Sequence, residues 1–244
     1  NIGFSRTNSA DNYVTDSAAG GTALACGKKT RNGMIGMSPD SVAIPSILEL
    51  SDKAGLSTGL ISTVAITHAT PASFIAHVPN RSLYEDIALD FLDTDIDVFI
   101  GGGRKFFNNR KDGRNLCKEL EEKGYRLYDN LEAAKDDNKG HIGILAAEEH
   151  MPTAPTRVPT LQASTQKAID ILKQDDKGFF IMIEGSQIDW GGHNNVINDV
   201  VNETLDLDKA VGIALKYAVE DGNTLIVVTA DHETGGLSVL RGNP

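Results

Sequence analysis

The stretch "PTLQASTQKAIDILKQDDKGFFIMIEG" (residues 159–185) decides the fold class, because it joins an amphipathic segment to a short apolar run. The apolar run, "FFIMIEG" (residues 179–185), ends in a carboxylate and a glycine, as buried parallel strands often do. The amphipathic segment carries apolar residues on one face of a predicted helix. These residues are Leu161, Ala168, Ile169 and Leu172. A helix that leads into a buried strand is the repeating unit of an α/β fold.

The same alternation continues along the chain. Four further apolar runs predict strands at residues 59–66, 97–103, 142–146 and 224–231. Amphipathic helices are predicted at residues 41–55, with Ser41 as the candidate cap and Gly55 as the stop, and at residues 200–222. The pattern therefore predicts an α/β fold with a mostly parallel central sheet and helices on both faces.

The 244 residues are 40% hydrophobic and 23% charged, which is typical of a soluble globular protein. We expect one domain over residues 1–244, with an inserted subdomain or crown within residues 105–159, where charge clusters and prolines gather. The chain begins at Asn1 rather than Met and ends at Pro244 just after a strand-like run, so we expect it to be incomplete at both ends.

The charge balance narrows the classes of partner. Asp and Glu number 34 against 23 Lys and Arg, which gives a formal net charge of −11 and argues against a nucleic acid or an anionic membrane. No apolar run approaches the length of a membrane span, and no signal peptide is recognised. Cys26 and Cys117 show no CxxC spacing. No zinc ribbon or redox pair is therefore indicated. One disulfide between them is open, and two buried free thiols are the favoured prediction.

The segment "YVTDSAAGGTALACGKK" (residues 13–29) places Ser17 between Asp16 and a run of small residues that leads into a predicted helix. Ser and Asp are common helix caps, and on this segment alone a cap is the favoured interpretation. The alternative is an anion site, because small residues admit close approach and a helix N-terminus favours negative charge.

Polar side chains gather where the predicted strands end, which is where α/β sheets carry their chemistry. Glu184 follows the strand at residues 179–183, and His68 and Thr70 follow the strand at residues 59–66. A carboxylate beside a buried strand needs a partner, so Glu184 is the hardest of these to explain as ordinary surface. His68 and Thr70 alone could form an ordinary capping turn.

Two further pairs have the composition of metal ligands. Asp189 and His193 lie four residues apart, so they point the same way on a helical turn. Asp231 and His232 are adjacent at a predicted strand end. A carboxylate with an imidazole suits zinc, whereas oxygen ligands alone suit magnesium. Each pair by itself could be a solvated helix face or a turn, and their joint occurrence at successive strand ends carries the argument.

Four motifs in order resemble the alkaline phosphatase family over nearly the whole chain: "VTDSAAGGTA", "HATPASFIAHVPNR", "EGSQIDWGGHNN" and "TADHETGG". The resemblance implies metal-dependent hydrolysis of phosphate monoesters through a phosphoserine intermediate on Ser17. It also implies that Arg81 grips phosphate, that Asp16 orients Arg81, and that Trp190 contributes to phosphate contacts.

The resemblance further implies two Zn²⁺ ions and one Mg²⁺ ion. It assigns Asp189 and His193 to one zinc, and Asp231 and His232 to the second. It assigns Thr70 and Glu184 to magnesium, with His68 tuning that site. A periplasmic or extracellular location and a homodimer also follow from the family alone.

The resemblance also names two ligands that this sequence does not contain. Family members carry an aspartate near the end of a first core strand, which would precede Asn1, and a further histidine that would follow Pro244. His77, His141 and His150 do not match that histidine. The resemblance therefore implies an incomplete three-metal centre and weak or absent activity in this chain.

Three rival functions stay open. A phosphodiesterase of the same superfamily is the first, although the Asp16–Ser17 pair, Arg81 and the Thr70/Glu184 site favour a monoesterase. A catalytically silent metal- or phosphate-binding module is the second. A serine hydrolase of carboxyl esters is the weakest, because no GxSxG motif surrounds Ser17.

Overall fold

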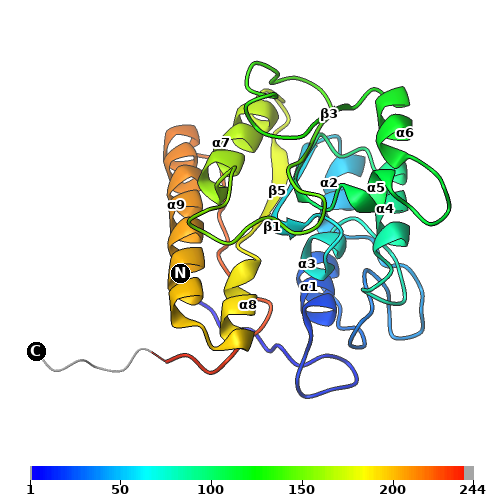
Figure 1. Ribbon diagram of the computed structural model, residues 1–244. Coiled ribbons are helices and arrows are strands. Elements are labelled where there is room, and N and C mark those ends of the chain that lie inside the picture. The colour runs from blue at the N-terminus through cyan, green and yellow to red at the C-terminus, as the bar shows by residue number, and fades with distance from the viewer. Residues whose placement is uncertain (1, 239–244) are drawn as a thin grey trace, which may run out of the picture.

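A computed structural model describes residues 2–238, and Asn1 and residues 239–244, where the sequence suggested cut ends, lie outside the described part. The helices are α1 (Ser17–Cys26), α2 (Ile47–Lys53), α3 (Ala69–Ala72), α4 (Tyr84–Asp93), α5 (Lys105–Asn108), α6 (Leu116–Glu122), α7 (Leu161–Leu172), α8 (Gln187–Asn194) and α9 (Ile197–Asp221). The strands are β1 (Ser57–Ala65), β2 (Val98–Gly102), β3 (Arg126–Tyr128), β4 (Ile142–Leu145) and β5 (Phe179–Glu184). Figure 1 shows their arrangement.

The strands form one five-stranded sheet in the order β3-β4-β2-β1-β5. Every ladder between them is parallel, and β1 in the interior pairs with β2 on one side and β5 on the other. Figure 1 shows α7 and α9 on one side of the sheet and the α1–α6 group on the other. The predicted α/β class with a parallel sheet covered on both faces is confirmed.

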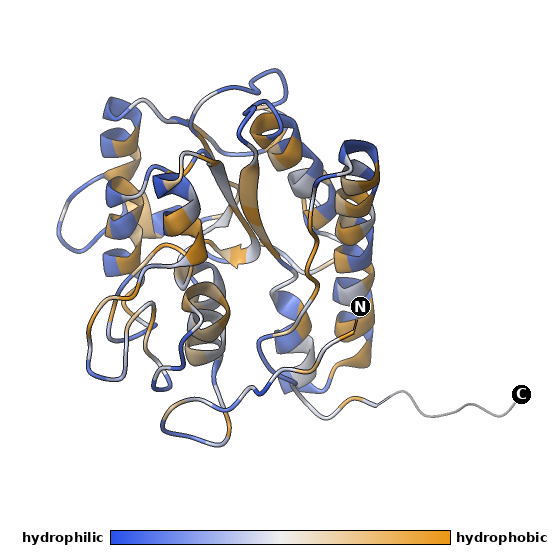
Figure 2. Cartoon of the chain, turned by 180° about the vertical axis from the view of Figure 1, so that it is seen from behind, coloured by the Kyte–Doolittle hydropathy of each residue, from blue (hydrophilic) through white to orange (hydrophobic). Residues whose placement is uncertain are grey.

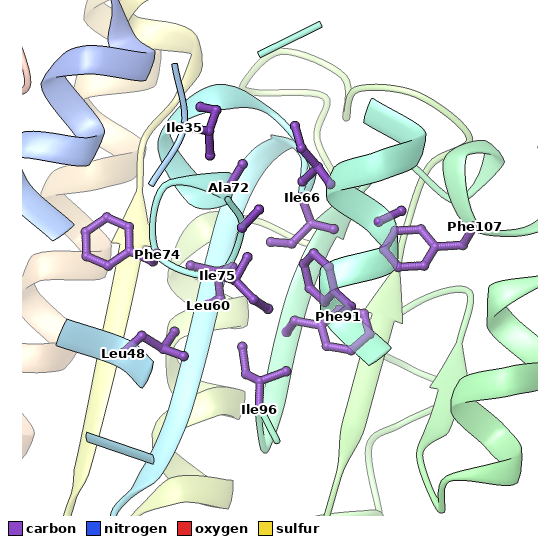
Figure 3. Packing of buried hydrophobic residues seen from close by; sticks show 14 of the residues in the cluster. Ile35, Leu48, Leu60, Ile66, Ala72, Phe74, Ile75, Phe91, Ile96 and Phe107 are labelled. Carbon is purple, nitrogen blue, oxygen red and sulfur yellow. The ribbon is translucent and has the colours of Figure 1, made fainter. Parts of the chain in front are cut away.

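Each face of the sheet has its own hydrophobic core, because successive side chains of a strand point to opposite faces. Leu60 and Phe99 face the cluster that includes Leu48, Ile75 and Phe91, which Figure 3 shows from close by. Their neighbours Ile61, Val98 and Ile100 face the second cluster, under α7 and α9. Figure 2 shows mostly apolar strands at the centre and helices that carry both apolar and polar residues. On α9 several apolar residues are exposed, among them Leu205 and Val219.

The helix before β1 begins later than predicted. Ser41 does not cap it, because Ser41 has a positive φ of 62° in a turn. Ser46 is the cap: its Oγ accepts the N–H of Glu49, and the Glu49 carboxylate accepts the Ser46 N–H. This capping box satisfies two backbone donors at once, which decides where α2 starts. Gly55 follows the helix as predicted.

The predicted strand at residues 224–231 is wrong in the described structure. The segment is irregular chain, and Leu225, Val227 and Val228 are exposed, Leu225 by 86%. A strand exists only as part of a hydrogen-bonded ladder, and among the described residues β5 pairs with β1 alone. Apolar composition therefore did not suffice to form a strand there. The short strand β3 was not predicted, because three residues carry no readable alternation.

Residues 105–159 contribute β3 and β4 to the sheet, and the idea that this region is an inserted subdomain stays a prediction. Its last part is tied to α9 by a buried ion network. Arg157, whose side chain is 1% exposed, donates from Nη2 to Glu203 at 2.6 Å and to Asp206 at 2.8 Å. The same carboxylates accept the backbone N–H groups of Ala154 and Leu161.

Both cysteines are free, as predicted. Cys117 is buried and Cys26 is half-buried. Burial raises the pKa of the Cys26 thiol to about 11, which keeps it protonated at neutral pH. No helix among residues 2–238 is both long and apolar enough to span a membrane.

His77 links α2 to the loop after α3. Its Nδ1 lies 2.7 Å from the Gly36 carbonyl oxygen and its Nε2 lies 3.1 Å from Glu49 Oε1. A carbonyl and a carboxylate are both acceptors, so these contacts favour the charged ring, in which both nitrogens donate. The hydrogen bond with Glu49 accordingly raises the pKa of His77. Burial would raise the pKa of Glu49, but its hydrogen bonds with His77 and Ser46 hold it below its ordinary value.

We therefore expect the His77–Glu49 pair to make stability depend on pH. A raised pKa of His77 adds stability that is complete below about pH 6.5 and is lost as pH rises through the folded-state pKa. A lowered pKa of Glu49 adds stability above about pH 4.5 that is lost at more acid pH. His77→Gln should lower the free energy of unfolding most between these limits, as measured by urea denaturation. The control is His141→Gln, and a His77 effect that does not vary with pH would contradict the assignment.

The Arg157 network predicts a large and local effect on stability. Arg157→Met should lower the free energy of unfolding by about 3–5 kcal/mol, because it leaves two buried carboxylates without their cation. The matched control is Arg126→Met, which breaks the more exposed pair with Asp137 and should cost at most about 1 kcal/mol. Equal losses in the two variants, measured by urea denaturation, would show that burial does not set the strength of these pairs.

Candidate active site

The predicted site residues come together at the carboxyl edge of the sheet, beside the N-terminal end of α1. Thr70 lies on α3, which follows β1, and Glu184 is the last residue of β5. Asp189 and His193 lie on α8, directly after β5. Asp231 and His232 belong to the irregular chain that follows α9.

Ser17 is the first residue of α1, and Asp16 is the cap. The Asp16 side chain accepts the backbone N–H of Ala19 at 3.0 Å. The capping role predicted for this segment therefore falls to the aspartate, and the buried serine hydroxyl is left for another partner. That partner is His232, whose Nε2 lies 3.2 Å from Ser17 Oγ.

The Asp16 carboxylate also holds Arg81. Its Oδ2 accepts from Arg81 Nη1 at 3.1 Å and from the Gly33 N–H at 3.0 Å. The guanidinium thus lies beside the residue that precedes Ser17, although Arg81 is distant in sequence. Positions 16, 17 and 81 form one connected group at the start of α1.

The glycines of α1 allow other segments of the chain to pack closely against this helix. A Cβ on Gly20 would lie 3.0 Å from Asp231 Cβ, and a Cβ on Gly21 would lie 2.9 Å from Ser73 Oγ. Gly20 therefore lets Asp231 approach the helix, and Gly21 lets α3 do so. This close packing is what brings His232 to Ser17 and Thr70 to the same edge.

The tautomer of His232 follows from its other contacts. Its Nδ1 lies 2.9 Å from the Glu233 carbonyl oxygen, which can only accept, so Nδ1 is the protonated nitrogen. In the neutral ring Nε2 then carries a lone pair directed at Ser17 Oγ. His232 can accept the serine proton, or it can offer the same lone pair to a metal.

Thr234 connects the two predicted zinc pairs, and it was not among the predicted site residues. Its hydroxyl donates to Asp189 Oδ1 at 2.6 Å and lies 3.0 Å from His232 Nδ1. His193 Nε2 lies 3.4 Å from the same Asp189 oxygen, and its side chain is 66% exposed. The "DHETGG" motif contained the signal, since the threonine stands two residues after His232.

Glu184 lies in a strongly electronegative environment. Burial raises its pKa to about 7, hydrogen bonds from Ser186 and Thr70 oppose the rise, and the charges of Asp231 and Asp189 add to it. The charges of three carboxylates are thus felt at this edge. Asp231 Oδ2 is buried without a hydrogen-bond partner, and the nearest side chain that could carry a positive charge is His232, whose Nε2 lies 3.4 Å away. Burial of an oxygen in this state is costly unless something else binds it.

His68 and Trp190 meet at 6.0 Å between ring centroids, with planes at 80°. Burial, together with the charge of Arg81 and the neighbouring His150, lowers the pKa of His68 to about 3, so the ring is neutral. The Nδ1 of His68 is buried without a partner. His150 was not among the predicted site residues, but its ring lies against both. The ring centroid of His150 is 5.7 Å from that of His68 and 4.7 Å from that of Trp190.

The side chains of the two predicted zinc pairs have the chemistry of divalent-metal ligands. Within each pair the histidine lies close to the aspartate. Imidazole nitrogens and carboxylate oxygens suit zinc, and the unpartnered oxygen of Asp231 and the crowded carboxylates would be relieved by a cation. Within residues 2–238 no three or more His, Cys, Asp or Glu side chains are arranged to hold one ion. The Asp189/His193 and Asp231/His232 pairs would be the contact points for such ions.

Comparison with known protein families shows to which family this chain belongs. The family described as "Alkaline phosphatase" matches residues 1–243. The chain belongs to the alkaline phosphatase family. The solved alkaline phosphatase from the Antarctic bacterium TAB5 has the same fold, with a TM-score of 0.92 and 45% identity over 95% of this chain and 69% of that one. A mutant of that enzyme is described with Mg bound in its M3 site.

Several similar proteins are named alkaline phosphatases. Alkaline phosphatase 4 of Bacillus subtilis is 41% identical over 94% of this chain and 51% of its own length. The alkaline phosphatase of Escherichia coli is 34% identical over 90% of this chain and 58% of its own length. The chain thus spans about half the length of these relatives.

The close contact between α1 and α3 gives a testable prediction for this chain. Gly21→Val should lower the free energy of unfolding by about 1–3 kcal/mol, because the new side chain meets Ser73 and Thr70 in a packed interface. The control is Gly212→Val in α9, where nothing lies within 4 Å of an added Cβ. The control should be neutral or stabilising, since valine is a better helix former than glycine. Equal behaviour of the two variants would contradict the close packing.

Proposed function

We propose that this chain carries the phosphate-transfer site of an alkaline phosphatase that hydrolyses phosphate monoesters through a phosphoserine on Ser17. The observation that supports this best is the contact of 3.2 Å between Ser17 Oγ and His232 Nε2 at the start of α1. Arg81 is held near this contact by its ion pair with Asp16, the residue before Ser17. A hydroxyl next to a base, a helix N-terminus and a guanidinium is the combination that attack on a phosphate ester requires.

The residues of the chain have distinct roles in this proposal. The Ser17 hydroxyl attacks phosphorus, and the bond from Ser17 Oγ to phosphorus forms as the bond to the leaving alcohol breaks. His232 Nε2 lies beside the serine hydroxyl, and Glu233 fixes the tautomer. The single lone pair of Nε2 can take the serine proton or hold a cation, but not both at once. Arg81 binds phosphate oxygens through its planar fork, and Asp16 orients that fork. Water then hydrolyses the phosphoserine and releases inorganic phosphate.

Divalent metals belong to the proposal as cofactors. Two Zn²⁺ ions would be held at Asp189/His193 and Asp231/His232, and one Mg²⁺ ion at Thr70/Glu184 beside His68. When bound, such ions lower the pKa of the nucleophile and stabilise the attacking and leaving oxygens. The unpartnered oxygen of Asp231 and the raised pKa of Glu184 support cation binding at this edge.

One rival function has a specific observation in its favour. The zinc donors form pairs among the described residues, whereas zinc in catalytic sites normally has three protein ligands. A silent metal- or phosphate-binding chain would share these pairs. Monoester turnover by the 244-residue chain would exclude the silent function, whereas weak or absent turnover is expected of this chain in either case. Comparing a monoester with a diester tests the phosphodiesterase alternative.

The role of Ser17 is tested by Ser17→Ala. We expect this variant to lose covalent trapping of radiolabelled phosphate at acid pH and to lose monoester turnover, because no hydroxyl faces His232. Zinc content measured by elemental analysis should change little. The control is Ser82→Ala, which removes an exposed hydroxyl next to Arg81 in sequence. Trapping by Ser17→Ala at the level of the Ser82 control would refute the nucleophile.

The role of Arg81 is tested by Arg81→Ala. Charge-assisted hydrogen bonds contribute about 1.5–3 kcal/mol, so inorganic phosphate should bind about 10- to 100-fold more weakly in isothermal titration calorimetry. The control is Arg31→Ala, which removes an exposed guanidinium and changes the net charge equally. Arg81→Lys should recover only part of the affinity because the fork is lost. Unchanged phosphate binding would place Arg81 outside the site.

A location in the periplasm or outside the cell, and assembly as a homodimer, complete the proposal. Family membership alone supports both. Fractionation of the source cells and light scattering of the purified protein are the direct measurements.

A further inference from the structure

His150 lies at the carboxyl edge of the sheet although it belongs to the 105–159 region. Its ring centroid is 4.7 Å from that of Trp190, and the planes meet at 87°. It is also 5.7 Å from the ring of His68, at 84°. Perpendicular contacts at these distances are the favoured edge-to-face geometry of aromatic rings. His150 therefore touches two rings whose own elements, α3 and α8, are far apart in sequence.

The imidazole of His150 is anchored by the backbone of β1. Its Nδ1 lies 3.1 Å from the nitrogen of Ala65, which donates its N–H. A nitrogen that accepts a hydrogen bond carries no proton, so the ring is in the tautomer with Nε2–H. This bond fixes the ring plane relative to the end of β1. The ring is thus oriented independently of Trp190.

The loop that carries His150 is also held in place. The Gly103 and Arg104 N–H groups donate to the Ala147 carbonyl at 2.9 Å and 3.0 Å, and Gln187 Nε2 donates to the Met151 carbonyl at 2.8 Å. A Cβ on residue 102 would lie 2.1 Å from the Glu149 carbonyl oxygen, so only glycine allows the loop to lie this close to β2. His150 therefore has a fixed backbone on which to hold its ring.

We propose that His150 is a positioning residue of the candidate active site, whose ring sets the orientation of Trp190 against His68. The effect on the orientation of Trp190 follows from the ring contacts of His150 and its hydrogen bond with Ala65, without reference to function. The effect on phosphate rests on the proposed function, in which Trp190 contributes to phosphate contacts. The test separates the two.

Trp190 is the only tryptophan in the chain, so its fluorescence reports this contact directly. Two variants separate the ring contact of His150 with Trp190 from its hydrogen bond with Ala65. His150→Phe keeps a ring and loses the acceptor, whereas His150→Asn keeps an acceptor for the Ala65 N–H and loses the ring. The matched controls are His141→Phe and His141→Asn, because His141 precedes β4 at the opposite edge of the sheet.

We expect His150→Asn to shift the emission of Trp190 to longer wavelength and to increase its quenching by acrylamide. His150→Phe keeps the ring but loses its bond to Ala65, so it should change both measurements less than His150→Asn does. The His141 controls should remain close to the wild type. A role limited to anchoring the loop predicts the reverse order of the two His150 variants. That reverse order, equal changes in both variants, or no change in His150→Asn would overturn the proposal.

The second measurement is the affinity for inorganic phosphate, by calorimetry with ZnCl₂ and MgCl₂ present. His150→Asn should weaken binding about two- to ten-fold, the worth of one aromatic pair, while His150→Phe should stay near wild type. A fluorescence change without a change in phosphate affinity would keep His150 as the residue that positions Trp190. It would overturn only the link to phosphate, and with it the place of Trp190 in the proposed function.

Discussion

The carboxylate of Asp16 is the interaction on which the rest of the site depends. One oxygen caps α1, and the other binds both Arg81 and the loop at Gly33. A cap fixes where a helix begins, so the same group sets the position of Ser17 and the place of the guanidinium beside it. Because α1 then packs through glycines against Asp231 and α3, the position of Asp16 is transmitted to the other groups of the site.

The fold was predictable where the signal was local. Four of the five predicted strands and the helices at α7 and α9 follow from periodicity and apolar composition. The segment at residues 224–231 failed, because its apolar run is a strand only if a ladder partner lies beside it, and periodicity cannot supply that partner. The cap of α2 was misplaced for a different reason: two serines precede the helix, and only the reciprocal bond with Glu49 distinguishes Ser46.

The residues of the candidate site were predictable because motifs at strand ends are short and the sheet brings strand ends together. The structure places Ser17 beside His232 and Arg81 beside Asp16, and Thr234 links Asp189 to the same edge. The roles of these residues stay predictions. Thr234 and His150 were missed because their contacts cross from one motif to another. His150 reaches Trp190 only through the path of its loop over β2, which no local pattern encodes.

The charges at the sheet edge set the condition under which this acidic chain would bind an anion. The charges of Asp189 and Asp231 add to the raised pKa of Glu184. A phosphate ester brings further negative charge, and Arg81 already shares its own charge with Asp16. Binding beside three carboxylates becomes favourable only when divalent cations reverse the local field. Metal and phosphate would therefore each strengthen the binding of the other, since both act on the same set of carboxylates.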